Sequence, residues 1–129
     1  MRSYAREVAF CKIYTYLITN QCEEGFEQFD MDKLTEEDLD FAKKLVDGVI
    51  ATKEELDKIV GQFSQSFKLS RIYRLDLAAL EMALYEMINM DTPHPVVINE
   101  AVSLAKKFST EKSVSYVNGI LGAYERSLL

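Results

Sequence analysis

Apolar residues recur at intervals of three and four along almost the whole chain, and no useful length alternates apolar with polar residues as a strand does. This spacing places the apolar residues on one face of successive helices, so it predicts an all-α protein of six or seven helices. The expected apolar stripes are Phe10, Ile13 and Leu17; Leu39, Ala42, Val46, Val49 and Ile50; Leu56, Ile59, Val60, Phe63 and Phe67; Leu77, Leu80, Leu84, Met87 and Ile88; Val97, Ala101, Leu104 and Phe108; and Val114, Val117, Leu121, Tyr124 and Leu128.

Local signals separate these helices. Thr35 with Asp38, and Thr52 with Glu55, have the spacing of capping boxes, which predicts that one helix begins after Thr35 and another after Thr52. The stretch "DTPHP" at 91–95 must end a helix, because proline cannot continue one. The helix before it, at 75–89, is apolar nearly all round and is therefore expected at the centre of the fold.

The last stripe contains Asn118-Gly119, a dipeptide that often forms hairpin turns. On a helical wheel the surrounding apolar residues share one arc, which a hairpin would scatter, so a helix is predicted. The opposite side then carries small and polar residues with a cation on either flank. Either a neighbouring helix packs on that side, or it is a docking surface for an extended polymer such as RNA. Its residues are Lys112, Ser115, Asn118, Gly119, Gly122 and Arg126.

The chain has 129 residues, 48% of them hydrophobic, enough for a single globular domain with its own core. Its net charge of -6 lies entirely in the first half, where residues 1–60 hold 8 Lys or Arg and 14 Asp or Glu. A basic strip elsewhere is still possible, because salt screens charges beyond ~8 Å. The two cysteines are expected to be reduced thiols in a cytoplasmic protein. No apolar run approaches the ~18 residues of a membrane span, so no membrane association is expected.

No motif announces catalysis, a metal site or a cofactor. His94 is the only histidine and is expected in a loop. Glu81 and Glu86 are five residues apart on a helix and so on different faces, which argues against an acid/base pair. We therefore expect a protein that is not an enzyme. Three tyrosines lie off the centres of their apolar stripes and are candidates for stacking on bases: Tyr4, Tyr14 and Tyr116.

Several segments resemble the NusB family of bacterial transcription antitermination factors: "ARE" at 5–7, "IY" at 13–14, "ALYEM" at 83–87, "PVVINEAVSLAKKFSTEKS" at 95–113 and "YVNGIL" at 116–121. The resemblance implies that residues 1–129 form one RNA-binding domain of two small helical subdomains. It also implies that the protein binds the boxA element of nascent RNA together with the ribosomal protein NusE. The resulting complex lets RNA polymerase pass terminators, above all in ribosomal RNA operons.

By position, the resemblance implies RNA contacts from Arg2, Arg6, Tyr14, Lys112, Tyr116 and Asn118, and a meeting with NusE on the face around Asp76. Arg6 also lies near its helix's apolar stripe, so a structural ion pair is the alternative for it. The chain departs from the family in having few arginines before "ARE" and in having Glu81 where the family typically has arginine. Fewer phosphate contacts lower affinity, so weak RNA binding that NusE strengthens is expected.

Two other functions fit the same sequence. The first is a helical protein-interaction adaptor that keeps the NusB fold, has weakened or lost RNA binding, and could form a homodimer. The second is the RNA-guiding domain of a ribosomal RNA methyltransferase, which is disfavoured because no cofactor-binding domain follows Leu129. The RNA-binding function requires the amino-terminal cations and the small-residue side of the last helix to be neighbours that are open to water.

Overall fold

The computed structural model describes residues 1–65 and 68–129, and Phe67 of the third predicted stripe lies outside them. Within these ranges the chain is helical, without a strand. Its elements in order are α1 (Arg2–Thr19), the 3-10 helix η1 (Met31–Lys33), α2 (Glu36–Phe63), the 3-10 helix η2 (Leu69–Arg71), α3 (Arg74–Asn89), α4 (His94–Phe108) and α5 (Glu111–Ser127).

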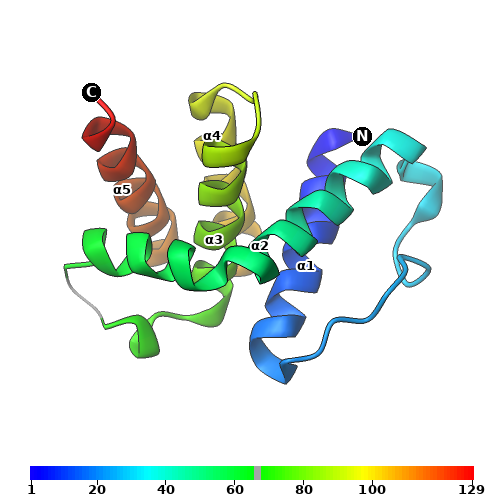
Figure 1. Ribbon diagram of the computed structural model, residues 1–129, viewed down its shortest axis with the longest axis horizontal. Coiled ribbons are helices and arrows are strands. Elements are labelled where there is room, and N and C mark those ends of the chain that lie inside the picture. The colour runs from blue at the N-terminus through cyan, green and yellow to red at the C-terminus, as the bar shows by residue number, and fades with distance from the viewer. Residues whose placement is uncertain (66–67) are drawn as a thin grey trace.

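Helix α3 is the centre of the fold, as its apolar sequence predicts. It packs against all four other α-helices and is buried along most of its length. Figure 1 shows α2 crossing in front of α3, with α1 and α5 on opposite sides. The amino-terminal part of α2 lies over α1, and its carboxy-terminal part reaches α5. The main core therefore surrounds α3.

The predicted helix boundary at Thr52 is confirmed in part. Residues 36–63 run as one element, α2, but the backbone at Thr52 is not helical (φ -115°, ψ 18°), so two helical segments meet there at a kink. The Thr52 hydroxyl donates to the Gly48 carbonyl at 2.7 Å, in the turn that precedes it, so it does not cap a new helix. The described residues accordingly contain five α-helices in place of six or seven. The capping box at Thr35 and Asp38 is confirmed.

Helix α5 continues through Asn118-Gly119, which confirms the helical interpretation. A Cβ atom added at Gly119 would meet nothing within 4 Å, and one at Gly122 would meet only the Arg126 guanidinium at 3.3 Å. The proposal that a neighbouring helix packs on these glycines is therefore wrong. Gly48 shows the contrast, since its added Cβ would lie 2.0 Å from Cζ of Tyr85, a ring that packs directly on the α2 backbone.

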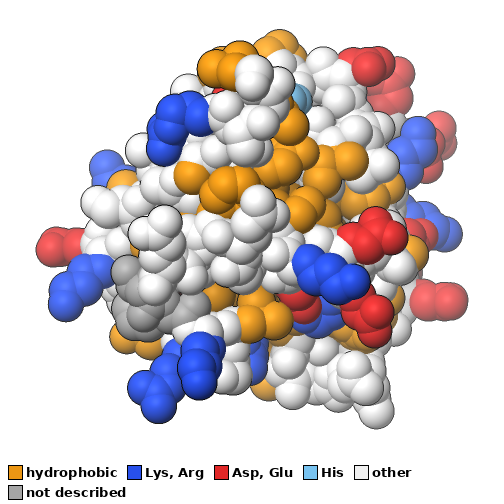
Figure 2. Space-filling model, turned by 60° about the vertical axis from the view of Figure 1, so that its left-hand side comes forward, with side chains coloured by type: hydrophobic (Ala, Val, Ile, Leu, Met, Phe, Trp, Pro, Cys, Tyr) orange, Lys and Arg blue, Asp and Glu red, His pale blue; other side chains and the backbone are white. Residues whose placement is uncertain are grey.

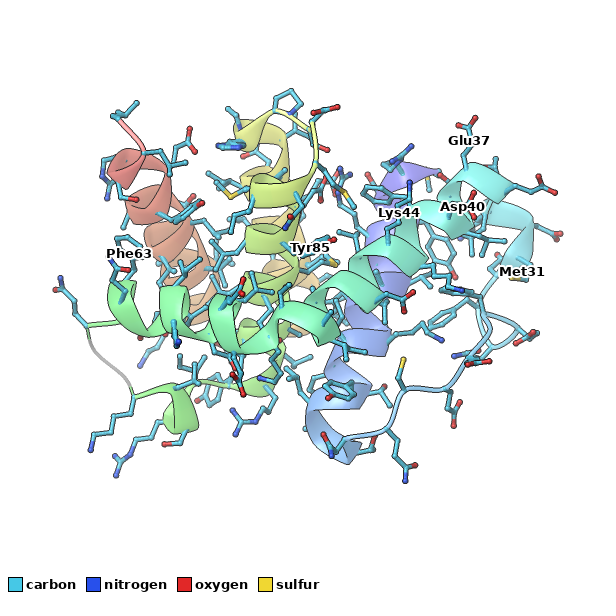
Figure 3. All side chains as sticks on the ribbon, in the orientation of Figure 1. Met31, Glu37, Asp40, Lys44, Phe63 and Tyr85 are labelled. Carbon is cyan, nitrogen blue, oxygen red and sulfur yellow. The ribbon has the colours of Figure 1, made fainter. Side chains whose placement is uncertain are left out.

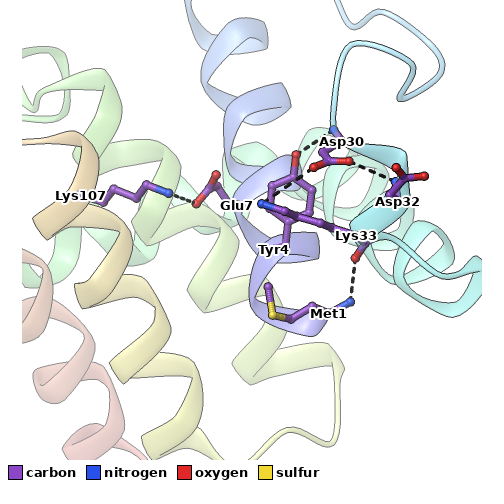
Figure 4. Close-up of polar contacts among 7 residues, drawn as sticks. All are labelled: Met1, Tyr4, Glu7, Asp30, Asp32, Lys33 and Lys107. Carbon is purple, nitrogen blue, oxygen red and sulfur yellow. Dashed lines mark hydrogen bonds and ion pairs between the residues drawn. The ribbon is translucent and has the colours of Figure 1, made fainter.

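The long connection between α1 and α2 is fastened to the start of α1. Figure 4 shows the Tyr4 hydroxyl accepting a hydrogen bond from the Asp30 amide at 2.9 Å, and the Met1 ammonium donating to the Lys33 carbonyl at 2.9 Å. The Lys33 ammonium lies 5.3 Å from the centre of the Tyr4 ring. Tyr4, a candidate for base stacking, thus has a structural role here.

Candidate nucleic-acid interface

The predicted site residues fall into two groups on opposite sides of α3. Arg2, Arg6 and Tyr14 come from α1, whereas the other predicted RNA contacts come from α5. Figure 1 shows α3 and α4 between these two helices. The expectation that the amino-terminal cations lie next to the small-residue side of the last helix is therefore wrong. We also expected that side of the helix to be open to water, and this holds at Gly119.

Arg6 is a structural cation, which is the alternative raised by its position on the helical wheel. Its side chain is only 5% exposed, and it forms a two-pronged ion pair with Glu86 through Nε–Oε1 at 2.9 Å and Nη2–Oε2 at 2.6 Å. Its Nη1 lies 3.6 Å from Glu100. Burial lowers the pKa of Arg6, but the hydrogen bond and charge of Glu86 outweigh this and the pKa is raised overall. The predicted RNA contact at Arg6 is corrected on these grounds.

Arg2 is exposed but lies in acidic surroundings. Its guanidinium stacks on the Phe41 ring at 4.1 Å from the ring centre. Arg2 also lines a groove of about 890 Å³, which we call the amino-terminal groove. The charged residues in its lining are Arg2, Glu37, Asp40, Lys44, Asp47 and Asp91. Figure 3 shows Glu37, Asp40 and Lys44 projecting from this part of α2. Four carboxylates against two cations give a surface that repels a polyanion.

Tyr14, the third predicted contact on α1, is half-buried against the core. Part of its ring is therefore unavailable for stacking in this conformation.

A second groove lies at the start of α5 and has the opposite character. It encloses about 400 Å³ and is lined by Arg71, Ile72, Tyr73, Asp76, Thr110, Lys112, Ser113 and Tyr116; we call it the α5 groove. Lys112 is exposed, and Tyr73 is 62% exposed, the most exposed aromatic side chain of the described residues. Cations beside accessible aromatic rings are the groups that hold phosphates and unpaired bases.

Tyr116 is fixed in the wall of the α5 groove. Its hydroxyl and the Ser64 hydroxyl form a hydrogen bond of 2.6 Å, which ties α5 to the end of α2. Burial raises the pKa of Tyr116, and the hydrogen bond to Ser64 only partly offsets this. The phenol therefore remains neutral at physiological pH and adds no negative charge to the groove.

Asp76 forms the floor of the α5 groove and is only 4% exposed. Its carboxylate accepts hydrogen bonds from Ser109 at 2.7 Å and Ser113 at 2.9 Å, so it joins the start of α3 to the start of α5. Asp76 itself is therefore almost covered by its neighbours. What faces outward around it is the rim of the groove, with Tyr73 and Lys112 exposed.

Asn118 lies further along α5 and does not line the α5 groove. It is exposed, as is Gly119 beside it, and nothing in the described chain covers that position. Arg71 and Tyr73 are the groove residues that the sequence did not single out. They lie on η2 and directly after it, where a short 3-10 turn carries no helical periodicity to mark them. Their only sequence signal is local, an aromatic between two arginines in "RIYR" at 71–74.

The acidic, histidine and cysteine side chains of the described residues form no group of three that could hold a metal ion. Glu81 and Glu86 each pair with a different cation, so they do not form an acid/base pair. In the same ranges, no helix is both long enough and apolar enough to traverse a lipid bilayer.

Comparisons with known proteins agree with the fold and with the segments described above. The model of the NusB family matches residues 3–126. The transcription antitermination protein NusB of Acetivibrio thermocellus is 43% identical over 127 residues, which covers 94% of this chain and 86% of that protein. NusB of T. maritima has a solved structure with a TM-score of 0.85 and 25% identity, covering 98% of this chain and 91% of that one. A solved complex of the antitermination factors NusB and NusE with dsRNA contains a chain with a TM-score of 0.83 and 27% identity, covering 98% of this chain and 96% of its own.

Proposed function

The chain belongs to the NusB family, and we propose that it is a transcription antitermination factor that binds boxA-type RNA together with the ribosomal protein NusE. The observation that carries this proposal is the 43% identity, over nearly the whole chain, to a transcription antitermination protein. The likeness to a NusB chain solved with NusE and RNA supports both partners. The complex of the protein with RNA and NusE would act on RNA polymerase, because antitermination is a change in how the polymerase responds to terminators.

In this proposal RNA binds in the α5 groove. Lys112 and Arg71 neutralise phosphates, and Tyr73 offers a ring on which an unpaired base can stack. Asn118 can donate and accept hydrogen bonds, and Gly119 allows the RNA backbone to come close to the helix. Arg6 takes no part, because its guanidinium is bound to Glu86.

The surface that we propose for NusE binding borders the α5 groove. Asp76 positions the start of α5, and the residues around it are the rim on which a second protein can rest. RNA would then be held between the two proteins, which accounts for tighter binding when both are present. We further propose that residues 1–129 act as one non-enzymatic, cytoplasmic RNA-binding domain. Its two subdomains are α1 with the amino-terminal part of α2, and α3–α5 with the rest of α2.

A filter-binding titration tests this function. A boxA-type RNA and a scrambled RNA of equal length are each titrated with the protein, with and without NusE. We expect weak selective binding by the protein alone, a marked gain with NusE, and loss of that binding in Lys112→Glu. If boxA-type RNA gains no affinity over scrambled RNA in either condition, the proposal is wrong.

Gly119→Ala probes the close approach separately. Alanine favours the helix by about 1 kcal/mol over glycine, and the site has room for the methyl group, so the variant is expected to be more stable than the wild type. Its RNA affinity is nevertheless expected to fall, because the methyl group stands where the RNA backbone approaches. Equal or higher RNA affinity would remove Gly119 from the interface.

A second candidate function is that of a protein-interaction adaptor with weakened RNA binding. The positions of the two arginines of α1 favour it. Arg6 is buried and Arg2 lies among carboxylates, so the amino-terminal cluster offers little to RNA. The double variant Arg2→Glu with Lys112→Glu separates the two functions. An RNA-binding factor loses RNA binding in this variant, whereas an adaptor binds its protein partner as well as the wild type does.

A further inference from the structure

A third groove lies between the end of α1 and the η2 segment. It encloses about 580 Å³ and is lined by Tyr16, Leu17, Asn20, Lys53, Lys68, Leu69, Ser70, Arg74 and Leu77; we call it the α1 groove. Its lining contains three cations, three uncharged polar side chains and no carboxylate. None of the residues predicted from the sequence to contact RNA or NusE lies in it.

Two of the three cations have no opposing charge among the described residues. Lys53 is held by Asp57 at 2.6 Å and Glu81 at 3.0 Å, so its charge is largely compensated. Lys68 and Arg74 form no ion pair with any residue that the structure describes, and Arg74 makes only a long contact of 3.4 Å to the Ile72 carbonyl. Lys68 is exposed and Arg74 is half-buried, so both remain accessible from the groove. The α1 groove therefore has a net positive charge.

The α1 groove and the α5 groove lie on the two sides of one segment. Arg71, Tyr73 and Asp76 line the α5 groove, whereas Lys68, Ser70 and Arg74 line the α1 groove. Figure 1 shows η2 at the lower left of the molecule and the end of α1 to its right, and Figure 2 shows Lys and Arg side chains projecting at the lower left of the face that it draws. Cations are thus present on both sides of this segment, Lys112 and Arg71 in the α5 groove and Lys68 and Arg74 in the α1 groove.

We propose that the α1 groove binds the phosphodiester backbone of RNA that extends beyond the α5 groove. This inference rests on the proposed function and adds the direction in which the bound RNA leaves its main site. Lys68 and Arg74 neutralise two phosphates, and Ser70, Asn20 and Tyr16 supply hydrogen-bonding groups around them. The amino-terminal groove is a poor alternative path, because four carboxylates line it.

Fluorescence anisotropy with labelled RNAs of two lengths tests the proposal, in the presence of NusE. One RNA is the boxA-type element alone, and the other carries about ten additional uridines at each end, enough to reach past one groove. The wild type is expected to bind the longer RNA more tightly and with a steeper salt dependence. Each phosphate contact to a single strand adds ~0.7 to the slope of log K against log salt, so two contacts add about 1.4.

The double variant Lys68→Gln with Arg74→Gln is expected to lose this gain and to bind both RNAs equally, with the short-RNA affinity unchanged. Lys43→Gln with Lys44→Gln is the matched control. It removes the same charge from exposed positions on the amino-terminal part of α2, and it should keep the gain. Lys68→Gln alone is measured as well, because Lys68 is fully on the surface and its variant folds even if the Arg74 variant does not.

The outcomes separate this proposal from the function on which it rests. If the wild type binds neither RNA selectively, the proposed function fails. If it binds the short RNA selectively but gains nothing from the added length, or if the Lys68 variants keep the whole gain, the α1 groove is not part of the RNA path and the α5 groove stands alone.

Discussion

Helix α3 buries three carboxylates, and two of them, Glu86 and Glu81, have sharply different surroundings. Glu86 receives two hydrogen bonds from Arg6, so each of its oxygens has a donor. Glu81 is also fully buried, but it shares a single cation, Lys53, with a second carboxylate, Asp57. One oxygen of each acid in this second cluster has no hydrogen-bond partner among the described residues. The first cluster is complete, and the second lacks a donor.

A proton on Glu81 supplies the missing hydrogen-bond donor. Burial, followed by the hydrogen bond and negative charge of Asp57, raises the pKa of Glu81 to about 8, and Lys53 offsets only part of the effect. Glu81 is therefore mostly protonated at neutral pH, and its hydroxyl can donate to Asp57. The comparison teaches that a guanidinium can supply a donor to both oxygens of a buried carboxylate, whereas a buried carboxylate takes up a proton where one ammonium serves two acids.

The largest expected effect comes from breaking the complete cluster. Arg6→Met leaves Glu86 buried without its partner, which typically costs about 3–5 kcal/mol. Urea unfolding followed by circular dichroism measures this loss. Arg2→Met is the control, because it removes only an exposed contact with Phe41 worth ~0.5–1 kcal/mol. A loss at Arg6 no larger than that at Arg2 would show that the Arg6–Glu86 pair does not hold α1 to α3.

The sequence predicted the helices better than the interface. Helical periodicity marks the core, and α3 is central as its all-round apolar pattern indicated. The capping signal at Thr52 marked the position where the helical backbone is interrupted but not the form of the interruption, because a threonine hydroxyl can cap the next turn or, as here, bond to the preceding one. Periodicity does not say which charges are buried together: Arg6 and Glu86 are 80 residues apart, and only the packing of α1 on α3 joins them.

The α5 groove illustrates the same limit. Lys112 and Tyr116 were identified from the helical wheel and from likeness to a family, and the structure adds Arg71 and Tyr73, which line the same groove because the chain folds back at η2. Packing also gives a structural context to Glu81, at a position where the family resemblance predicts an arginine. Here the Glu81 carboxylate pairs with Lys53 from α2.

The second-largest effect is expected at Lys53, the only cation of the incomplete cluster. Lys53→Met leaves Glu81 and Asp57 facing each other without a counter-charge, at a cost of about 2–3 kcal/mol at pH 8. The cost should be smaller at pH 5, where Glu81 is neutral. Urea unfolding at the two pH values measures it, with Lys58→Met, an exposed lysine on the same helix, as the control. Equal losses at both pH values would contradict a protonated Glu81.

Glu81→Gln sharpens the comparison through its pH dependence. Glu81 binds a proton in the folded protein up to about pH 8 but in the unfolded chain only up to about 4.5, so the folded state holds more protons between these values. Wild-type stability therefore falls as pH rises through that window, by at most ~1.4 kcal/mol per pH unit. The variant carries no titrating group at this position. Its stability relative to the wild type should therefore rise from pH 5 to pH 8, by up to about 3.5 kcal/mol.

Glu86→Gln is the matched control for this experiment. Arg6 donates to both oxygens of Glu86, so replacing Glu86 disrupts the same pair of contacts at either pH and should lower stability by a similar amount at pH 5 and pH 8. A pH-dependent gain in the Glu86 variant, or none in the Glu81 variant, would abolish the distinction between the two clusters.

Asp57→Asn is expected to have the smallest effect, because it supplies the missing donor directly. The asparagine amide can donate to the free oxygen of Glu81 while Lys53 keeps the other, so both oxygens are satisfied without a proton. Stability at pH 5 should change by less than about 1 kcal/mol. The pH dependence should weaken without vanishing, since burial, the larger cause of the raised pKa of Glu81, remains. An unchanged slope between pH 5 and pH 8 would mean that burial alone raises this pKa and that Asp57 is a bystander.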